Sequence, residues 1–465
     1  MSQIPIVGPS YLLRVRKADV QRSVNLFPSI VESGTGKAPA ILQSIPGLVL
    51  FADTGAEIRA MRTAKDGRLY VISGPTLNEL SSSGAITSRG TLTTTTGAAD
   101  IALNLTELIV VDGPYGYTSN FASNVFEPIN APAFNGSVRV SVLNGRAIYV
   151  KPNSQQFSLS GIDDANLIDT LDFASAESSP DNIVTHIVDH GQVFFFGENG
   201  IEIWDDTGGT DFPLSRNEGA KIETGTSAAF SVKKLDNTVF WLGNDERGGG
   251  IVWKLSGYTP VRVSTQAIEE MLQSVTDLST AVAYTYQQDG HSFYCLNVPG
   301  LSTTLCFDVA TGNWHERAEL TAGEYAQHRG QFHAYAFGKH LIGTASGKIY
   351  QYDPTANTNA GDILVRDRIS PHQATPSYKR QSFAVLQVDC VIGKGKPDGS
   401  APQLMMRYSN DGGIAWGNWR TASMGAIGER RKRTIYRRLG EAHDRCWWIR
   451  CTEDTQFAIV GANVE

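Results

Sequence analysis

Nine histidines and five cysteines are the residues of this chain whose spacing could build a metal or redox site. The tightest histidine set is His328, His333 and His340. In a β-strand, side chains an odd number of residues apart point to opposite faces, so these three are not expected to converge on a metal ion. Cys446 and Cys451, in the segment CWWIRC, are also five residues apart and have the surroundings of a half-buried strand. The sequence therefore predicts buried thiols, no metal and no cofactor.

The common catalytic motifs are missing from the sequence. It contains no G-x-S-x-G, no G-x-x-x-x-G-K-S/T and no H-E-x-x-H. The nearest approach to a phosphate loop is Gly34-Thr35-Gly36-Lys37, which lacks both the hydroxyl residue after lysine and a following helix. That segment is expected to be a flexible loop.

One short segment, Ser409 to Trp416 (SNDGGIAW), resembles the Asp box of sialidase-type propellers, S-x-D-x-G-x-T-W, with Ala415 where threonine is usual. In that motif the aspartate builds a turn and the tryptophan packs beneath it, so its role is structural. No spacing in the chain selects the arginine triad and tyrosine nucleophile of a sialidase. We therefore predict no catalytic residues and no enzyme activity; a sialidase-like glycoside hydrolase or a sugar-binding β-propeller adhesin is the alternative.

Basic residues are concentrated near the end of the chain. From Leu404 to Cys451 there are ten arginines and lysines against four acidic residues. The whole chain carries −7, so this stretch at +6 leaves −13 on the remainder. The guanidinium of arginine can donate two parallel hydrogen bonds to one carboxylate, so we predict that this stretch is a partner-docking site for an oppositely charged surface. A solvent-exposed edge of a sheet would have the same composition. The candidate docking residues are Arg430, Arg431, Lys432, Arg433, Arg437 and Arg438.

The elements that must position these residues are short β-hairpins. One pattern, a polar turn and two alternating apolar runs joined by a glycine-containing turn, occurs seven times at an average interval of about 45 residues. Two such strands cannot bury a face alone, so the copies must pack face to face. This predicts an all-β fold with a β-propeller of seven blades, or six. The copies begin near Asp66, Asn104, Asn144, His190, Asp236, Asp289 and Gly338.

The chain of 465 residues is longer than one hydrophobic core normally serves, and its character changes twice. We expect an N-terminal extended arm over 1–40, the propeller over 41–361, and a C-terminal β-sandwich-like domain with the basic stretch over 362–465. A strand near Ile41 is expected to complete a blade begun late in the chain. Apolar residues at helical spacing predict one short surface helix over 267–275. No signal peptide or membrane segment is expected, and the scattered cysteines favour a reducing compartment.

Several segments together resemble the packaged-DNA stabilisation proteins of short-tailed bacteriophages, which are also called tail hub, nozzle or tail accessory factors. The resemblance covers nearly the whole chain, because it begins at the N-terminus and continues to the closing strand at Glu465. The segments that carry it are RSVNLFP (22–28), IPGL (45–48), GENGIEIW (197–204), VRVSTQAIEEML (261–272), DGHSFYCLNVP (289–299), TLCFDVATGNWHER (304–317) and SNDGGIAWGNWR (409–420).

The resemblance implies a structural virion protein of the tail, made in the host bacterial cytoplasm and without enzyme activity. It implies a homo-oligomeric ring, a hexamer in similar proteins, that extends the portal and adaptor channel and retains packaged DNA until ejection. Its implied partners are further copies, the tail adaptor protein, tail fibre or spike proteins and a plug or needle. Genomic DNA would pass through the channel without sequence-specific binding, and no membrane insertion is implied.

Overall fold

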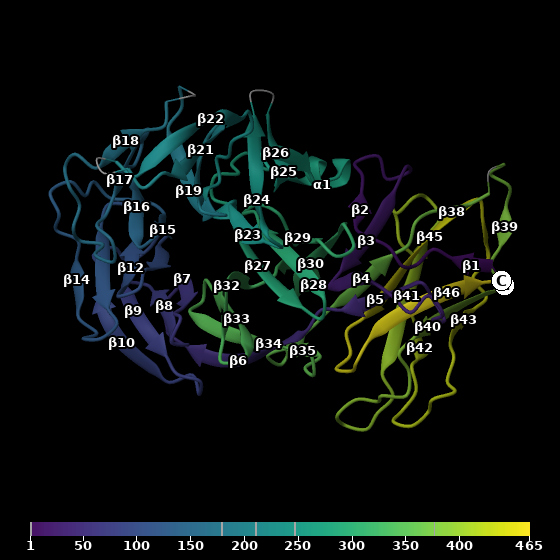
Figure 1. Cartoon of the computed structure of the whole chain (residues 1–465). Coiled ribbons are helices and arrows are strands. Elements are labelled where there is room, and N and C mark those ends of the chain that lie inside the picture. The colour runs from purple at the N-terminus through teal and green to yellow at the C-terminus, as the bar shows by residue number, and fades with distance from the viewer. Residues whose placement is uncertain (1, 178–179, 210–211, 246–247, 376) are drawn as a thin grey trace.

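The fold is known from a computed structural model that describes residues 2–177, 180–209, 212–245, 248–375 and 377–465. Figure 1 shows two lobes, a ring of small sheets and a second body that contains both termini. The described residues contain one α-helix, α1 (Gln266–Leu272), and one 3-10 turn, η1 (Ala229–Ser231); the other elements are strands. Helix α1 agrees with the helix predicted over 267–275. No helix in these ranges has the length and apolar character needed to cross a bilayer.

The larger lobe is a propeller of seven four-stranded antiparallel blades, which confirms the predicted fold. In each of the first six blades the strands pair in chain order, and the first strand lies innermost. The first four blades are β7 (Ile58–Thr63), β8 (Leu69–Ser73), β9 (Thr76–Leu80), β10 (Ile86–Thr91); β11 (Asp100–Leu103), β12 (Glu107–Val111), β13 (Gly116–Asn120), β14 (Phe126–Pro128); β15 (Val140–Leu143), β16 (Arg146–Val150), β17 (Gln156–Leu159), β18 (Phe173–Ser175); and β19 (Ile183–Asp189), β20 (Gln192–Gly197), β21 (Ile201–Asp206), β22 (Leu214–Ile222).

The last blade closes the ring with a strand from the start of the chain. The outermost strand β6 pairs antiparallel with β34, so the propeller has no open edge at its seam. Blades five to seven are β23 (Lys233–Leu235), β24 (Thr238–Asp245), β25 (Gly248–Ser256), β26 (Thr259–Arg262); β27 (Val282–Gln288), β28 (His291–Asn297), β29 (Thr304–Asp308), β30 (Asn313–Thr321); and β32 (Gly330–Ala336), β33 (Lys339–Thr344), β34 (Lys348–Asp353), β6 (Gly47–Asp53).

The predicted closing strand near Ile41 was placed a few residues too early. Ile41 lies in β5 (Ala40–Ser44), which pairs with β4 (Leu26–Ile30) in the second lobe. The chain crosses between the lobes at Ile45 and Pro46, immediately before β6. Both strands are short and apolar, and the local sequence does not indicate to which sheet each belongs.

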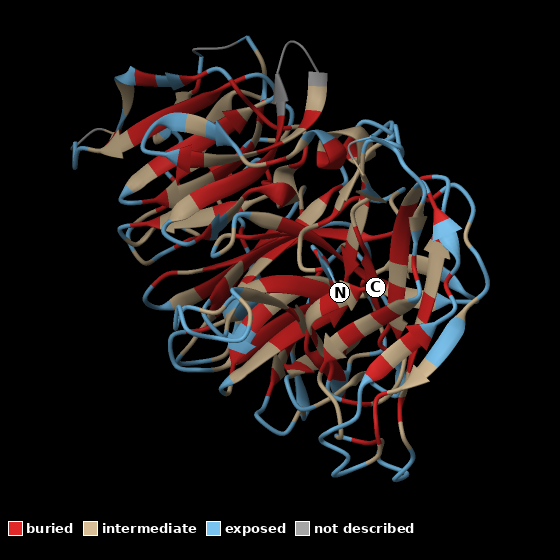
Figure 2. Ribbon diagram, turned by 90° about the vertical axis from the view of Figure 1, so that its right-hand side faces the viewer, coloured by how far each residue is buried: buried red, intermediate tan, exposed pale blue. Residues whose placement is uncertain are grey.

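The seven repeats of the sequence form the two middle strands of the seven blades. Their turns explain the pattern, because several are two-residue hairpins with both φ angles positive, as in Asn144-Gly145, His190-Gly191 and Asp289-Gly290. Figure 2 shows the buried residues as bands along the strands and the exposed ones at the loops. In the fifth repeat, Glu246 and Arg247 lie outside the described residues.

The second lobe consists of two sheets that share one apolar core, which confirms the predicted sandwich. Leu26, Leu42 and Ile459 from one sheet meet Leu404 and Trp447 from the other. The first sheet contains β4, β5, β46 (Ala458–Val464), β40 (Val385–Cys390), β43 (Thr434–Arg437) and β1 (Ser2–Ile4); the second contains β3 (Val20–Val24), β37 (Arg366–Ile369), β45 (Asp444–Cys451), β41 (Gln403–Ser409), β42 (Arg420–Ser423), β2 (Tyr11–Leu12) and β38 (Gln373–Ala374).

The N-terminal segment lies within this second lobe. Strand β1 pairs with the last strand, β46, so the two ends of the chain are neighbours (Figure 2). The division of the chain at residues 40 and 361 stays a prediction. The remaining short strands are β31 (Glu324–Gln327), β35 (Thr358–Asn359), β36 (Asp362–Ile363), β39 (Gln381–Ser382) and β44 (Glu441–Ala442).

One strand joins the two lobes. β3 runs parallel to β30 of the sixth blade, with Val24 opposite Glu316, so the second sheet of the sandwich continues into the propeller. Glu316, 1% exposed, forms an ion pair with Arg22. The buried side chain of Asn25 donates hydrogen bonds to the carbonyls of Ala318 (2.7 Å) and Val365 (2.7 Å). These polar contacts fix the sandwich against the propeller.

Candidate docking surfaces and the propeller channel

The basic stretch of the sequence divides into a packed set and an exposed set. The guanidinium of Arg407 lies 3.9 Å from the ring centre of Trp448, and that of Arg445 lies 4.1 Å from Tyr408. Arg450 forms an ion pair of 2.7 Å with the buried Asp367. Cations stacked on aromatic faces in this way stabilise the sandwich and are not free to bind a partner.

The six predicted docking residues belong to the exposed set. Residues 430–433 lie in the loop between β42 and β43, and Arg437 and Arg438 lie at the end of β43. All six are exposed, and none forms an ion pair within the described ranges. Arg420 donates hydrogen bonds of 3.1 Å to the carbonyls of Arg437 and Arg438, which fixes the backbone there. The structure thus brings these six side chains onto one edge of the sandwich.

A second loop, residues 391–402, extends this edge. The amide of Gly393 donates to the carbonyl of Met424 (3.0 Å), and the amide of Gly428 donates to the carbonyl of Gly393 (3.1 Å), so the two loops lie side by side. The second loop adds the exposed Lys394, and the first adds Ile427, which is 68% exposed. We call this group the basic surface: Lys394, Ile427, Arg430, Arg431, Lys432, Arg433, Arg437 and Arg438.

An acidic region that was not predicted lies on blades three and four. Residues 161–223 contain fourteen acidic side chains and only two basic ones, so a count of charge in a moving window would have found it. Figure 1 shows β18, β21 and β22 at the end of the molecule opposite β42 and β43. Its exposed members lie in strand β22, in the β17–β18 and β20–β21 loops and in the connections that follow β18 and β22; together we call them the acidic surface: Asp164, Asp169, Glu177, Glu198, Glu218 and Glu223.

The Asp-box-like segment forms the turn between β41 and β42. The carboxylate of Asp411 accepts hydrogen bonds from the hydroxyl of Ser409 (2.6 Å) and the amide of Ala415 (3.0 Å). Trp416 packs against Trp448, with ring centres 5.1 Å apart. The segment therefore stabilises a turn, as expected, but it does so in the sandwich and not in a propeller blade.

Two of the three clustered histidines meet, contrary to the sequence argument. Nε2 of His333 lies 3.1 Å from Nδ1 of His340, because a hairpin at Phe337 and Gly338 places the two on adjacent strands. The opposite-face rule holds along one strand and fails across a turn. Burial and the neighbouring His340 lower the pKa of His333 to about 3. His328 is buried separately, stacked on Tyr352 with ring centres 5.9 Å apart.

Another group that could hold a metal ion is His372, Asp444 and Cys446. Nδ1 of His372 lies 2.6 Å from the carboxylate of Asp444, and Nε2 lies 2.9 Å from the carbonyl oxygen of Arg16. Both ring nitrogens therefore have hydrogen-bond partners, and a metal would have to displace one of them. This group links the N-terminal segment to the sandwich.

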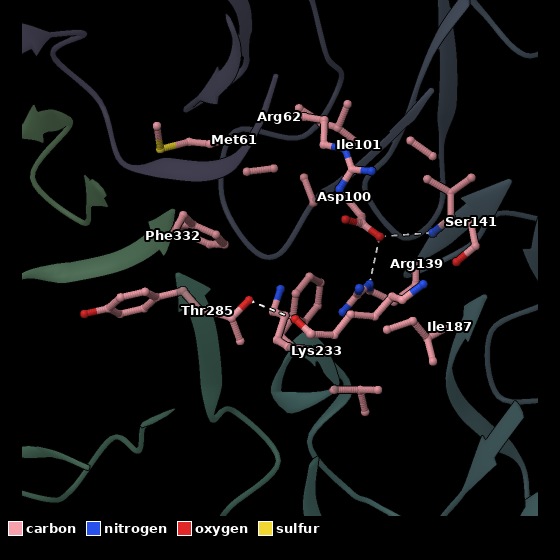
Figure 3. A pocket seen from close by; sticks show the side chains of 18 of the residues that line it. Met61, Arg62, Asp100, Ile101, Arg139, Ser141, Ile187, Lys233, Thr285 and Phe332 are labelled. Atoms are coloured by element: carbon pink, nitrogen blue, oxygen red, sulfur yellow. Dashed lines mark hydrogen bonds and ion pairs between the residues drawn. The ribbon is translucent and has the colours of Figure 1, made fainter. Parts of the chain in front are cut away.

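A cavity of about 470 Å³ occupies the centre of the propeller (Figure 3). The innermost strands of all seven blades contribute to its wall. Nε of Arg139 donates to the carboxylate of Asp100 (2.7 Å), and the amide of Val140 donates to the same carboxylate (3.2 Å). Burial alone would raise the pKa of Asp100, but Arg139 and Lys233 outweigh it and hold the pKa below its ordinary value.

Comparison with known proteins identifies the family. Residues 4–357 match the family described as "Bacteriophage P22 Gp10, beta-propeller", and residues 373–465 match "Bacteriophage P22 Gp10, beta-sandwich". No curated protein matches the chain.

Similar solved structures include a streptogramin B lyase, with 11% identity over 65% of this chain and 96% of that one and a TM-score of 0.45. The extracellular domain of the putative hybrid two component system BT4673 from B. thetaiotaomicron has 9% identity over 85% and 48%, with a TM-score of 0.46. The two family matches cover most of the chain and both lobes, and the chain therefore belongs to the family of the bacteriophage P22 protein Gp10, a phage tail and packaged-DNA stabilisation protein.

Proposed function

We propose that this protein is the tail hub or nozzle subunit of a short-tailed bacteriophage. Copies assemble into a ring, a hexamer as in similar proteins, which extends the channel of the portal and adaptor and retains the packaged genome. The protein is made in the host cytoplasm and acts in the virion tail. Family membership supports the structural role, and the distribution of charge supports the way in which copies join.

The observation that carries this proposal is that one chain has exposed basic residues around β42 and β43 and exposed acidic residues on blades three and four. Figure 1 shows that these elements lie at opposite ends of the molecule. Two different surfaces that complement each other make a head-to-tail contact, and head-to-tail contacts close into rings when the rotation permits. The basic surface of one copy then meets the acidic surface of the next. Paired hydrogen bonds from arginines to carboxylates fix how the two copies are positioned, and attraction between the opposite charges increases the rate at which they associate.

The other tail proteins bind surfaces that the ring leaves free. The tail adaptor protein, the fibre or spike proteins and the plug or needle are the partners in this proposal. Genomic DNA passes through the ring without sequence-specific binding, because the part of the chain outside the basic stretch carries −13 and repels phosphate. Retention then depends on the width of the channel and on its plug.

A charge-reversal variant tests the docking contact. Replacing Arg430, Arg431 and Arg433 by glutamate should leave the isolated subunit folded, because all three are exposed loop residues without ion pairs. We expect the variant to remain monomeric by size exclusion with light scattering and to yield heads that package DNA and then leak it.

The matched control makes the same change of charge outside the basic surface, at the exposed Lys17, Lys65 and Lys379. It should assemble as the unaltered protein does. Normal tail assembly by the arginine variant would refute the docking proposal. If the variant forms rings but fails to bind another tail protein, the basic surface contacts that protein instead of a neighbouring copy.

A further inference from the structure

The central cavity of the propeller has more positive than negative charge. Four cationic residues from three blades line it: Arg62 on β7, Arg139 just before β15, and Lys233 and Lys234 on β23. Lys234 forms an ion pair with Asp189, which leaves Arg62, Arg139 and Lys233 as the three cations considered below. Asp100, on β11, is the acidic residue of its lining. Figure 3 shows these three cations and Asp100 around the same space.

The single carboxylate is already neutralised by one of the three cations. Arg139 holds Asp100 with its Nε and donates from Nη1 to the carbonyl of Ala229 (3.0 Å), while its guanidinium lies 4.9 Å from the ring centre of Phe230. Arg62 and Lys233 form no hydrogen bond or ion pair with any side chain of the described ranges. Arg62 and Lys233 therefore face the cavity without a direct ion-pair partner in the part of the chain that the structure describes.

The surroundings of Lys233 show that its charge is poorly compensated. Burial, followed by repulsion from Arg139, lowers the pKa of Lys233 to about 7, although Asp100 acts in the opposite direction. Arg62 lowers it further. An anion that enters the cavity would therefore stabilise the protonated form of Lys233.

The other titratable groups of the wall do not supply that anion. Lys234 pairs outside the cavity with Asp189 (2.8 Å), the pKa of His333 is far below neutrality, and the hydroxyl of Tyr284 bonds to that of Tyr352 (3.0 Å). The rest of the wall facing Lys233 is uncharged: Ser141, Ile187, Phe230, Thr285 and Phe332.

We propose that the propeller channel binds a tetrahedral oxyanion of the phosphate type between Lys233, Arg62 and the free edge of Arg139. The space exceeds that of a chloride ion, and donors converge from three sides. Guanidinium groups match the paired oxygens of phosphate, and the ammonium of lysine serves as a point charge. The bound anion would join the innermost strands of blades one, three and five and stabilise the closed propeller.

Calorimetric titration of the whole chain with sulfate, phosphate and a deoxynucleoside monophosphate tests the proposal. Sulfate carries the same charge from pH 6 to pH 8, so any change in its affinity reports on the protein. Because Lys233 must be protonated to hold the anion, sulfate should bind about tenfold more weakly at pH 8 than at pH 6. Tighter binding of the nucleotide than of phosphate would identify a phosphate ester as the ligand; the reverse would identify the free ion.

Two variants and a control complete the test. Lys233→Met should weaken sulfate binding at least tenfold and remove its pH dependence. Arg62→Gln should weaken sulfate binding and shift its pH dependence to higher pH, because Arg62 no longer lowers the pKa of Lys233. Lys254→Met, on β25 of the same blade and outside the cavity lining, should change nothing. Absence of saturable binding up to about 10 mM, or equal binding by Lys233→Met, would overturn the proposal. None of these measurements depends on ring assembly.

Discussion

The junction between the lobes offers a sharp test of how the fold is held together. Glu316 is 1% exposed and accepts hydrogen bonds from Arg22 (Nε, 2.9 Å), from Ser10 (3.0 Å) and from Thr303 (2.9 Å). In Glu316→Gln, Arg22 loses its counter-charge where β3 joins β30. Removing one partner of a buried pair costs about 3–5 kcal/mol. The side chain of Arg22 is 16% exposed, so water can reach it, and we expect the lower end, about 3 kcal/mol.

The pH dependence of this cost has a definite sign. Burial alone would raise the pKa of Glu316, but Arg22 and the hydroxyl donors outweigh it and hold the pKa below its ordinary value. A carboxylate with a depressed pKa stabilises the fold above its unfolded pKa, and this stabilisation is lost as the pH falls through the folded pKa. The difference in free energy of unfolding between the two proteins should therefore be full at pH 7 and shrink below about pH 4.

Urea unfolding measures the free energy of unfolding of the two proteins, and hydrogen exchange shows which strands lose protection. We expect Glu316→Gln to unfold at lower urea and to lose protection first in peptides covering β3, β30 and β37. The control is Glu319→Gln on the same strand. Glu319 pairs with Arg329, but its side chain is 20% exposed, against 1% for Glu316, and Arg329 keeps a second ion pair with Asp362, so we expect a smaller cost, nearer the ~1 kcal/mol of a solvent-accessible ion pair. Equal effects of the two changes would refute the view that this pair couples the lobes.

Three further predictions follow from packing and charge. Gly47→Ala, in the closing strand, places a Cβ 2.6 Å from two carbonyl oxygens and should cost about 1–3 kcal/mol in thermal unfolding, whereas Gly461→Ala meets no atom and should cost little. All five cysteines are buried and free, so a thiol reagent should label none in the native protein and five in denaturant; rapid native labelling would contradict this. Fluorescence polarisation should show almost no binding of duplex DNA at physiological ionic strength, and tight, salt-sensitive binding would contradict the proposal that the wall of the ring's central channel repels DNA.

Local features of the fold could be predicted from the sequence, and pairings between distant segments could not. The seven hairpins could be predicted because each segment contains its own turn residues, such as Asn144-Gly145, and strands in which apolar and polar residues alternate. Helix α1 was readable from Ile268 and Leu272, which are buried at helical spacing. The closing strand was misplaced because Ile41 and Leu48 both lie in short apolar strands, and only the long-range partner distinguishes them.

The candidate sites show the same division. Clustered charge is local in sequence, so the loop at 430–433 was found, and the acidic residues at 161–223 could have been found by the same count. The residues that line the propeller cavity could not be found in this way, because Arg62, Arg139 and Lys233 lie on three different blades and come together only when the propeller closes. The contact of His333 with His340 was missed because side chains alternate between faces only along one strand. A turn lies between these two residues, so their separation in sequence does not tell on which face each side chain lies.

The position of the basic surface in the assembled tail is the sharpest test of head-to-tail docking between copies. Electron microscopy of the assembled ring, or of the virion, would locate the loop at 430–433 relative to blades three and four of the neighbouring copy. If copies join head to tail, the ring is closed, and arginines of this loop lie within ion-pair distance of acidic side chains such as Asp169 or Glu198 of the next copy. A ring in which the loop faces solvent, or a subunit that stays monomeric in the virion, would contradict this arrangement.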